Sequence, residues 1–182
     1  MTSSRPAGWR EQFLSLAGDL AVRDSAVLAA TAQSIDDPQA YLDRYEETAE
    51  RLGDRPDAAD DPQVPWLALV DRLLAALRAV EIDWRTDRDD IVWSLEHLAD
   101  YTALPQAVRD AITRLSCSDS IECLVAMAAL VATTEWRLVA LDIDSDSYVV
   151  MLLDSATYQR TTTAAESLGF VLRDIREHNP NA

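Results

Sequence analysis

Residues 137–154, R-L-V-A-L-D-I-D-S-D-S-Y-V-V-M-L-L-D, decide the fold of this chain. Apolar and β-branched residues run together here within an otherwise helical, alanine-rich sequence, which is typical of β-strands. We predict two antiparallel strands over residues 135–142 and 147–154, joined by a tight turn. Both strands are nearly continuous in apolar residues rather than alternating, so we expect helices to cover both faces of their sheet.

Helical patterns occupy most of the remaining chain. Trp9, Phe13, Leu16 and Leu20 repeat at the spacing of one helix face. Helices are predicted over residues 9–32, 38–53, 65–80, 87–101, 105–115 and 119–133. A last helix is predicted to begin at residue 161 and to bury Leu172 and Ile175. A short strand is predicted over residues 81–85. The predicted fold class is α+β: predominantly helical, with a small antiparallel sheet of two to four strands near the C-terminus, covered by helices.

The length of 182 residues favours a single domain over residues 1–182. Within it we distinguish an N-terminal helical part (1–53), an acidic, proline-rich loop (54–65) and an α+β core (66–182). The loop reads D-R-P-D-A-A-D-D-P-Q-V-P, a composition that indicates an exposed connection. It is not taken as a domain boundary, because the N-terminal helices are too few to fold alone.

The charge of the chain restricts its partners. The net charge is −16, and all 16 basic residues are arginine. Nucleic acid and anionic membrane both require a positive surface, so neither is an expected partner, whereas a basic protein is. The charge also has a simpler explanation, which is solubility. The absence of lysine excludes Schiff-base chemistry and a lysine phosphate loop.

The two cysteines, Cys117 and Cys123, lie six residues apart around a predicted helix start. Six residues along a helix turn through about 600°, so their side chains should diverge, and we expect no disulfide. Reduced cysteines indicate a cytoplasmic protein. The N-terminus has no apolar signal core, and the apolar run at 123–131 is too short to span a bilayer.

Three aspartates, Asp142, Asp144 and Asp146, lie in the turn between the two predicted strands. D-x-D-x-D resembles the opening of a calcium loop, but the positions that need glycine and glutamate hold Ser147 and Leu153. The first two aspartates also resemble the nucleophile motif of haloacid-dehalogenase-like phosphatases, which need a basic residue and a longer chain downstream. The simplest interpretation is a tight turn with solvent-facing carboxylates.

The predicted helix 87–101 has a second polar and aromatic stripe. Asp90, Trp93, His97 and Tyr101 lie together, opposite the apolar residues of the same helix. The stripe could contact a partner, because tryptophan and tyrosine are enriched at binding hot spots. It could also line a pocket in which His97 is an acid or base, or the helix could be packed on both sides.

Two segments together resemble a family of uncharacterised bacterial proteins. They are A-V-E-I-D-W-R-T-D-R-D-D-I at 79–91 and W-R-L-V-A-L-D-I-D-S-D-S-Y-V-V at 136–150; the family pairs an I-D-W segment with an L-D-x-x-S-D-S-Y hairpin. The resemblance implies no active site. The S-D-S-Y hairpin is also similar to the strand pair of small α+β immunity proteins that neutralise bacterial toxins. The first 60 residues fit neither pattern and are expected to be an addition particular to this chain.

The leading functional hypothesis is that the chain is a non-enzymatic, cytoplasmic bacterial protein that binds a basic protein. The most specific version of this hypothesis is a toxin-neutralising immunity protein. Acidic proteins of that kind use charge to speed the capture of basic toxins. One alternative is a small enzyme with an Asp/His pocket between helix 87–101 and turn 142–146; another is a divalent-metal binder. No catalytic residue, metal ligand or cofactor is predicted, and the candidate binding residues are Asp90, Trp93, His97, Tyr101, Asp142, Asp144, Asp146 and Tyr148.

Overall fold

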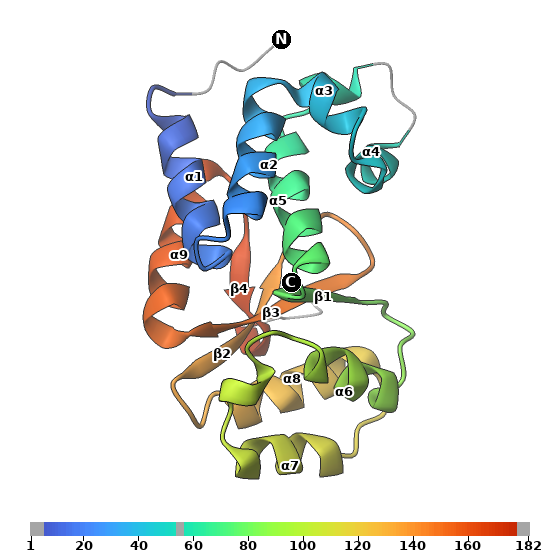
Figure 1. The fold of residues 1–182 in the computed structure, drawn as a ribbon. Coiled ribbons are helices and arrows are strands. Elements are labelled where there is room, and N and C mark those ends of the chain that lie inside the picture. Colours follow the sequence, from blue (N-terminus) through green and yellow to red (C-terminus); the bar gives the residue numbers. More distant parts are fainter. Residues whose placement is uncertain (1–5, 54–56, 178–182) are drawn as a thin grey trace.

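The computed structural model describes residues 6–53 and 57–177, which form a four-stranded antiparallel sheet with helices on both faces (Figure 1). The α+β prediction is confirmed. In chain order the elements are α1 (Trp9–Leu20), α2 (Ser25–Asp36), α3 (Pro38–Leu42), α4 (Glu46–Leu52), η1 (Ala58–Asp60), α5 (Val64–Ala75), β1 (Ala79–Ile82), α6 (Arg88–Glu96), η2 (Tyr101–Ala103), α7 (Gln106–Arg114), α8 (Ser120–Val131), β2 (Trp136–Leu141), β3 (Tyr148–Asp154), α9 (Ser155–Leu168), β4 (Leu172–Asp174) and η3 (Ile175–Glu177).

The predicted hairpin forms the centre of the sheet. The strand order is β1-β3-β2-β4, and every pairing is antiparallel. Strands β2 and β3 pair from Trp136 opposite Asp154 to Leu141 opposite Val149. β1 and β4 occupy the edges, so the two most apolar strands are shielded from solvent on both sides of the ladder.

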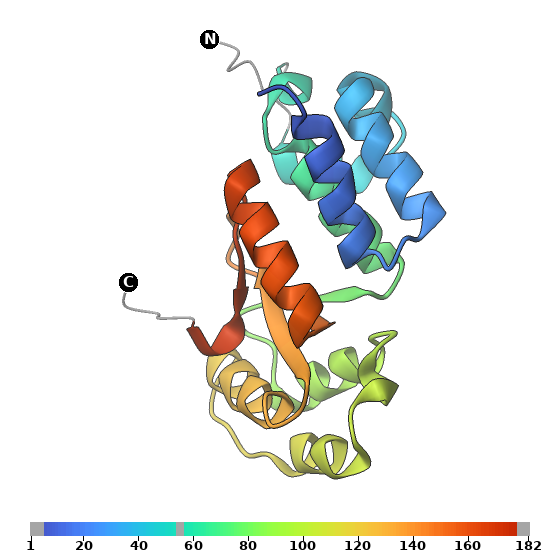
Figure 2. The same cartoon turned by 90° about the vertical axis from the view of Figure 1, so that its left-hand side faces the viewer.

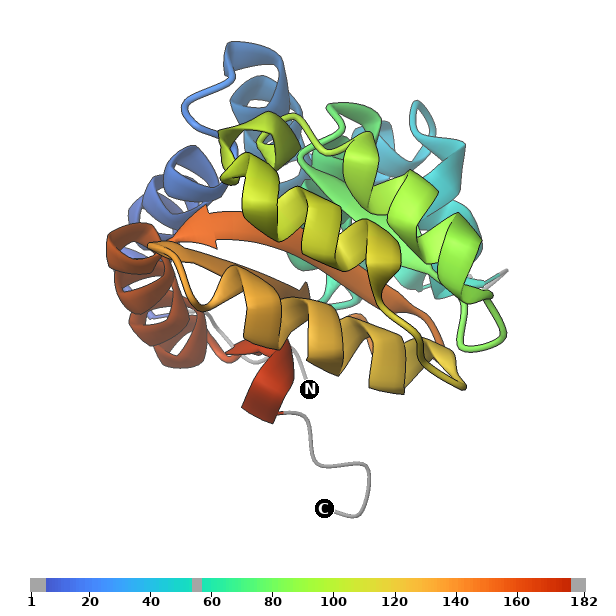
Figure 3. The same cartoon turned by 90° about the horizontal axis from the view of Figure 1, so that it is seen from below.

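Each face of the sheet packs against its own group of helices (Figures 2 and 3). Val139, Val149 and Met151 face a core formed with α1, α5 and α9. Leu138 and Leu152 point the other way, into a core formed with α6, α7 and α8. Alternate residues of a strand point to opposite faces, so an apolar residue at nearly every strand position serves two cores. The expectation that helices cover both faces is confirmed.

The predicted helix over residues 9–32 is wrong as a single element. The backbone takes the left-handed conformation at Val22 and Arg23, with φ of 50° and 59°, which separates α1 from α2. The Asp24 side chain then caps α2 by accepting from the backbone N–H groups of Ala26 and Val27. The predicted helix 38–53 is likewise divided into α3 and α4.

The last predicted helix is wrong at both ends. It begins at Ser155 rather than at residue 161, because the Asp154 carboxylate caps the first turn of α9. It ends at Leu168, because Gly169 takes the left-handed conformation with φ 86°. Leu172 therefore lies in β4, opposite Leu141, instead of on a helix.

Aromatic side chains join the N-terminal helices to the sheet. Phe170 stacks on Trp66 of α5, with ring centroids 4.9 Å apart, and meets Phe13 of α1 edge-on. The Trp66 indole donates to the carbonyl oxygen of Asp142 at 2.6 Å. Residues of the predicted N-terminal part thus share a core with the sheet. Residues 54–56 of the predicted loop lie outside the described chain, and the rest of it forms η1 and the start of α5.

A buried ionic network also ties α4 to the rest of the fold. The buried Asp71 carboxylate accepts from the Thr48 hydroxyl at 2.6 Å and from Arg51 Nε at 2.7 Å. The other end of the Arg51 guanidinium donates twice to Glu81 of β1. Arg51 therefore bridges α5 and the sheet edge, and it lowers the pKa of Glu81 below its usual value.

Candidate functional site

The segment between β1 and α6 forms a turn that exposes a tryptophan. The Asp83 carboxylate accepts from the backbone N–H of Arg85 at 2.7 Å, and the Asp83 carbonyl accepts from that of Thr86. These bonds place Trp84 and Arg85 at the tip of the turn. The Trp84 side chain is 49% exposed, and the Arg85 guanidinium lies over its ring at 4.3 Å. Large apolar side chains at the surface are candidates for contact with a partner.

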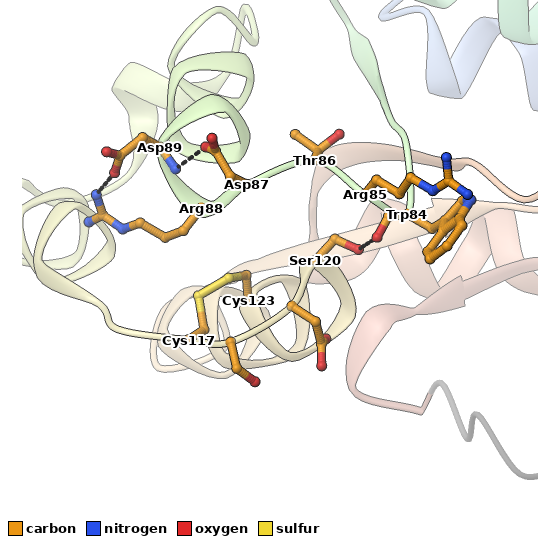
Figure 4. A pocket seen from close by; sticks show the side chains of 11 residues that line it. Trp84, Arg85, Thr86, Asp87, Arg88, Asp89, Cys117, Ser120 and Cys123 are labelled. Carbon is orange, nitrogen blue, oxygen red and sulfur yellow. Dashed lines mark hydrogen bonds and ion pairs between the residues drawn. A yellow bond between two sulfur atoms is a disulfide. The ribbon is translucent and has the colours of Figure 1, made fainter.

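The start of α8 holds this turn in place. Ser120, the first residue of α8, is buried, and its hydroxyl donates to the carbonyl oxygen of Trp84 at 2.7 Å (Figure 4). Asp119 caps α8 by accepting from Glu122 N–H, and the Glu122 carboxylate returns to the backbone N–H of Ser118. The hydrogen bond from the Ser118 hydroxyl, and after it the one from the Ser118 backbone N–H, lowers the pKa of Glu122. Residues 84–89 and the start of α8 enclose a cavity of about 620 Å³.

A disulfide between Cys117 and Cys123 forms part of the wall of this cavity (Figure 4). The prediction of two free cysteines is therefore wrong. Cys117 lies in an irregular segment before α8 rather than on the helix, and the chain bends at residues 118 and 119, so that the two Cα atoms are 5.2 Å apart. The argument from reduced cysteines to the cytoplasm no longer applies.

Trp84 also lines a second cavity, of about 470 Å³, together with Ser145, Asp146 and Tyr148. The strand register explains this meeting. Ile82 pairs with Tyr148, so the residue two positions after Ile82 comes to lie near the residue two positions before Tyr148. Two of the predicted binding residues, Asp146 and Tyr148, are thereby joined to a tryptophan more than 60 positions away in the sequence.

Helix α6 continues the surface away from the turn. Asp87 caps the helix by accepting from the N–H groups of Asp89 and Asp90. Trp93 lies one turn beyond these residues on the same face and is 61% exposed. The centroid of the Trp93 ring lies 4.2 Å from that of the His97 ring, and the Trp93 carbonyl oxygen lies 2.7 Å from His97 Nδ1.

We call this region the Trp84–Trp93 surface. It includes part of the β2–β3 turn, the tip of the turn after β1 and the exposed face of α6. Its residues are Asp146, Tyr148, Trp84, Arg85, Asp89, Asp90, Trp93 and His97. Its members are aromatic or acidic apart from Arg85 and His97. Such a surface offers ring faces and carboxylates to a cationic group.

Three of the eight predicted binding residues lie elsewhere. Tyr101 is buried in the core beneath the sheet, because α6 ends at Glu96 and the chain turns inward. Its burial raises the pKa of its phenol. Asp142 and Asp144 line a different cavity with Leu67 and Phe170.

The two cavities that hold the aspartates of the turn do not contain the other residues of the predicted enzyme pocket. The cavity that contains Asp142 and Asp144, and the one that contains Asp146, include neither His97 nor Asp90. The Asp142 carboxylate instead forms an ion pair with Arg173 at 3.3 Å and accepts a hydrogen bond from the backbone N–H of Asp144. Among residues 6–53 and 57–177, no three histidine, cysteine, aspartate or glutamate side chains gather as a metal site would require. Asp142 and Asp144 thus line one cavity, and Asp146 lines another.

Trp84 itself was not among the predicted binding residues. The sequence contained a usable signal, since an aspartate side chain can accept from the backbone N–H two residues on and so form an Asx turn; here that turn presents the intervening tryptophan to solvent. What could not be inferred was that Ser120 and Asp146 would lie beside it.

Comparison with known protein families identifies the family of this chain. A family model described as Domain of unknown function (DUF6630) matches residues 12–175. No curated protein and no solved structure matches the chain. The expectation that the first 60 residues are an addition to the family pattern is wrong, because the match begins at residue 12. None of the comparisons shows a similarity to toxin-immunity proteins. Across the described ranges, no helix is long and apolar enough to cross a membrane.

Proposed function

We propose that this chain, which belongs to the family described as Domain of unknown function (DUF6630), is a non-enzymatic module that binds a basic protein through the Trp84–Trp93 surface. The observation that carries the proposal is the exposure of two tryptophans beside acidic side chains, Trp84 in the turn before α6 and Trp93 on α6. Trp84 is held by its backbone rather than by burial of its ring. An exposed ring on a fixed backbone loses little conformational freedom when a partner covers it.

Charge supports a basic partner. With 32 acidic and 16 basic residues, the chain attracts cationic surfaces over distances comparable with the Debye length. Asp89 and Asp90 place two carboxylates one helical turn from Trp93; that of Asp89 is paired with Arg88, and that of Asp90 adds negative charge to the surface. Complementary charge of this kind speeds encounter and aligns partners, while buried aromatic rings supply most of the affinity.

In its finer form, the proposal is that the partner is a toxin and that the chain is a bacterial immunity protein of the cytoplasm. The acidic composition and the S-D-S-Y hairpin support this form. It is tested separately, by expressing the product of the adjacent gene with and without this protein. Neutralised toxicity supports the immunity form, and an adjacent product that is harmless or remains toxic refutes it.

The general proposal is tested by affinity capture from lysate of the source organism, followed by reconstitution with the purified partner. The wild-type protein is compared with the Trp84→Ala/Trp93→Ala double variant. A matched control, Leu77→Ala/Val171→Ala, removes two exposed apolar side chains outside the Trp84–Trp93 surface.

We expect a basic protein to bind the wild type and the control with the same affinity. Binding should weaken at least about 100-fold in the double variant, since two hot-spot side chains each contribute about 2 kcal/mol or more. It should also weaken with added salt. Equal affinity of the wild type and the double variant for every captured protein refutes the proposal.

A further inference from the structure

We propose that the cavity formed by Trp84, Ser145, Asp146 and Tyr148 binds the guanidinium group of an arginine side chain. This inference rests on the proposed function, because it names the chemical group by which the basic partner is recognised. The lining of the cavity contains two aromatic residues, Trp84 and Tyr148, and one carboxylate, that of Asp146. A guanidinium can stack on an aromatic ring and donate hydrogen bonds to a carboxylate.

The carboxylate in this cavity is available. Asp146 is exposed at the turn, and no hydrogen bond or ion pair joins its side chain to another described residue. Its neighbours in the turn are already used: Asp142 pairs with Arg173, and the Ser145 hydroxyl accepts from the backbone N–H of Ser147. Asp146 is therefore the free acceptor beside the Trp84 ring.

The chain itself shows that the Trp84 ring accepts a guanidinium. The Arg85 guanidinium lies 4.3 Å from the ring centroid. Arg85 lines the larger cavity and is not part of the lining of the smaller one. Figure 4 shows the Arg85 side chain beside the Trp84 ring. The smaller cavity, which Arg85 does not line, remains for a second cation.

The arrangement favours arginine over lysine. A guanidinium is planar and weakly hydrated, so it stacks on a ring while its edge donates two hydrogen bonds to one carboxylate. An ammonium group is compact, strongly hydrated and without a flat face. A half-exposed indole beside one carboxylate therefore offers arginine both of its preferred contacts, and offers lysine only the charge.

The test uses nuclear magnetic resonance of the ¹⁵N-labelled full chain, titrated with tetra-arginine and, separately, with tetra-lysine. The Trp84 indole signal is identified by its absence from the Trp84→Phe variant. The Trp66 indole, which is buried and donates to Asp142, is the internal reference. Tetra-arginine should move the Trp84 signal and leave the Trp66 signal in place.

Two substitutions separate a specific site from general charge attraction. Asp146→Asn removes the carboxylate of the cavity, and Glu166→Gln removes an exposed carboxylate from α9. We expect the first to weaken tetra-arginine binding at least about threefold and the second to leave it unchanged. The inference is overturned if tetra-lysine moves the Trp84 signal with equal affinity, if tetra-arginine leaves it in place, or if both substitutions act alike.

Failure of this inference is distinguishable from failure of the proposed function. If tetra-arginine leaves the Trp84 signal unmoved while the Trp84→Ala/Trp93→Ala variant loses its captured partner, the surface binds a protein by other contacts. If tetra-arginine binds as expected but no captured protein depends on the two tryptophans, the arginine site stands and the proposed function fails.

Discussion

Replacing Arg51 with methionine should destabilise the protein more than any surface substitution of the same kind. The Arg51 Nε atom lies 2.7 Å from the Asp71 carboxylate, and the Asp71 side chain is 3% exposed. Methionine keeps much of the length and apolar packing of the arginine side chain. The substitution therefore leaves a buried carboxylate with the Thr48 hydroxyl as its remaining side-chain donor among the described residues.

The expected magnitude follows from this geometry. Removing one partner of a buried ion pair costs about 3–5 kcal/mol. The lower end applies here, because the Arg51 side chain is 23% exposed and water can reach part of the network. We therefore expect the free energy of unfolding to fall by about 3 kcal/mol. For a chain of this size, that corresponds to a decrease in Tm of roughly 6–12 °C.

The assay is urea unfolding, followed by far-ultraviolet circular dichroism and tryptophan fluorescence. Arg10→Met is the matched control, because the ion pair of Arg10 with Asp36 is exposed on both sides, and we expect no resolvable change. Adding Asp71→Asn to the Arg51→Met variant removes the unpaired charge and should restore part of the lost stability.

Three outcomes would refute this reasoning about the buried network. One is a loss below about 1 kcal/mol for Arg51→Met, the range of exposed pairs. Another is an equal loss in the Arg10→Met control. The third is strict additivity of Arg51→Met and Asp71→Asn, which would mean that the two side chains do not interact.

Two further predictions concern pH and the disulfide. Arg51 lowers the folded-state pKa of Glu81 below the usual 4.5. The stability that Glu81 contributes is therefore present above pH 4.5, and it is lost as the pH falls through the folded-state pKa of Glu81. Urea midpoints measured between about pH 6 and about pH 3 should show a steeper acid loss in the wild type than in Arg51→Met, and parallel profiles would contradict this. Reduction of the Cys117–Cys123 bond should cost about 2 kcal/mol, the entropy of closing a short loop. Urea unfolding with and without dithiothreitol measures that cost. The stability of the Cys117→Ser/Cys123→Ala control variant should not change with the reductant. Detection of two reactive thiols in the unreduced, denatured wild type would exclude the bond.

Local patterns predicted much of the fold correctly. The strands at 136–141 and 148–154 follow from the apolar and β-branched composition of their own residues. Asp119 was predicted to start a helix and caps α8. These signals work because the atoms that form a cap, or the alternation that forms a strand, lie within a few residues of one another.

Local patterns were insufficient where two of them competed. Periodicity extended α1 through residues 22 and 23, although Asp24 was available as a cap for a new helix. The apolar spacing after residue 161 indicated a helix through Ile175, whereas Gly169 ends α9 and the edge of β2 recruits Leu172. A free strand edge is a tertiary feature, and its unpaired backbone groups decided the conformation of that segment.

The sequence by itself determined the apolar hairpin, its exposed aspartates and the acidic charge, because each depends on composition or on neighbours along the chain. Only the tertiary structure decided that Cys117 meets Cys123, that Asp142 and Asp146 line different cavities, and that Trp84 lies between Ser120 and Asp146. The physical reason is that strand register and helix packing set these distances. Contacts between distant residues form when several elements bury their apolar faces together, and no single segment encodes them.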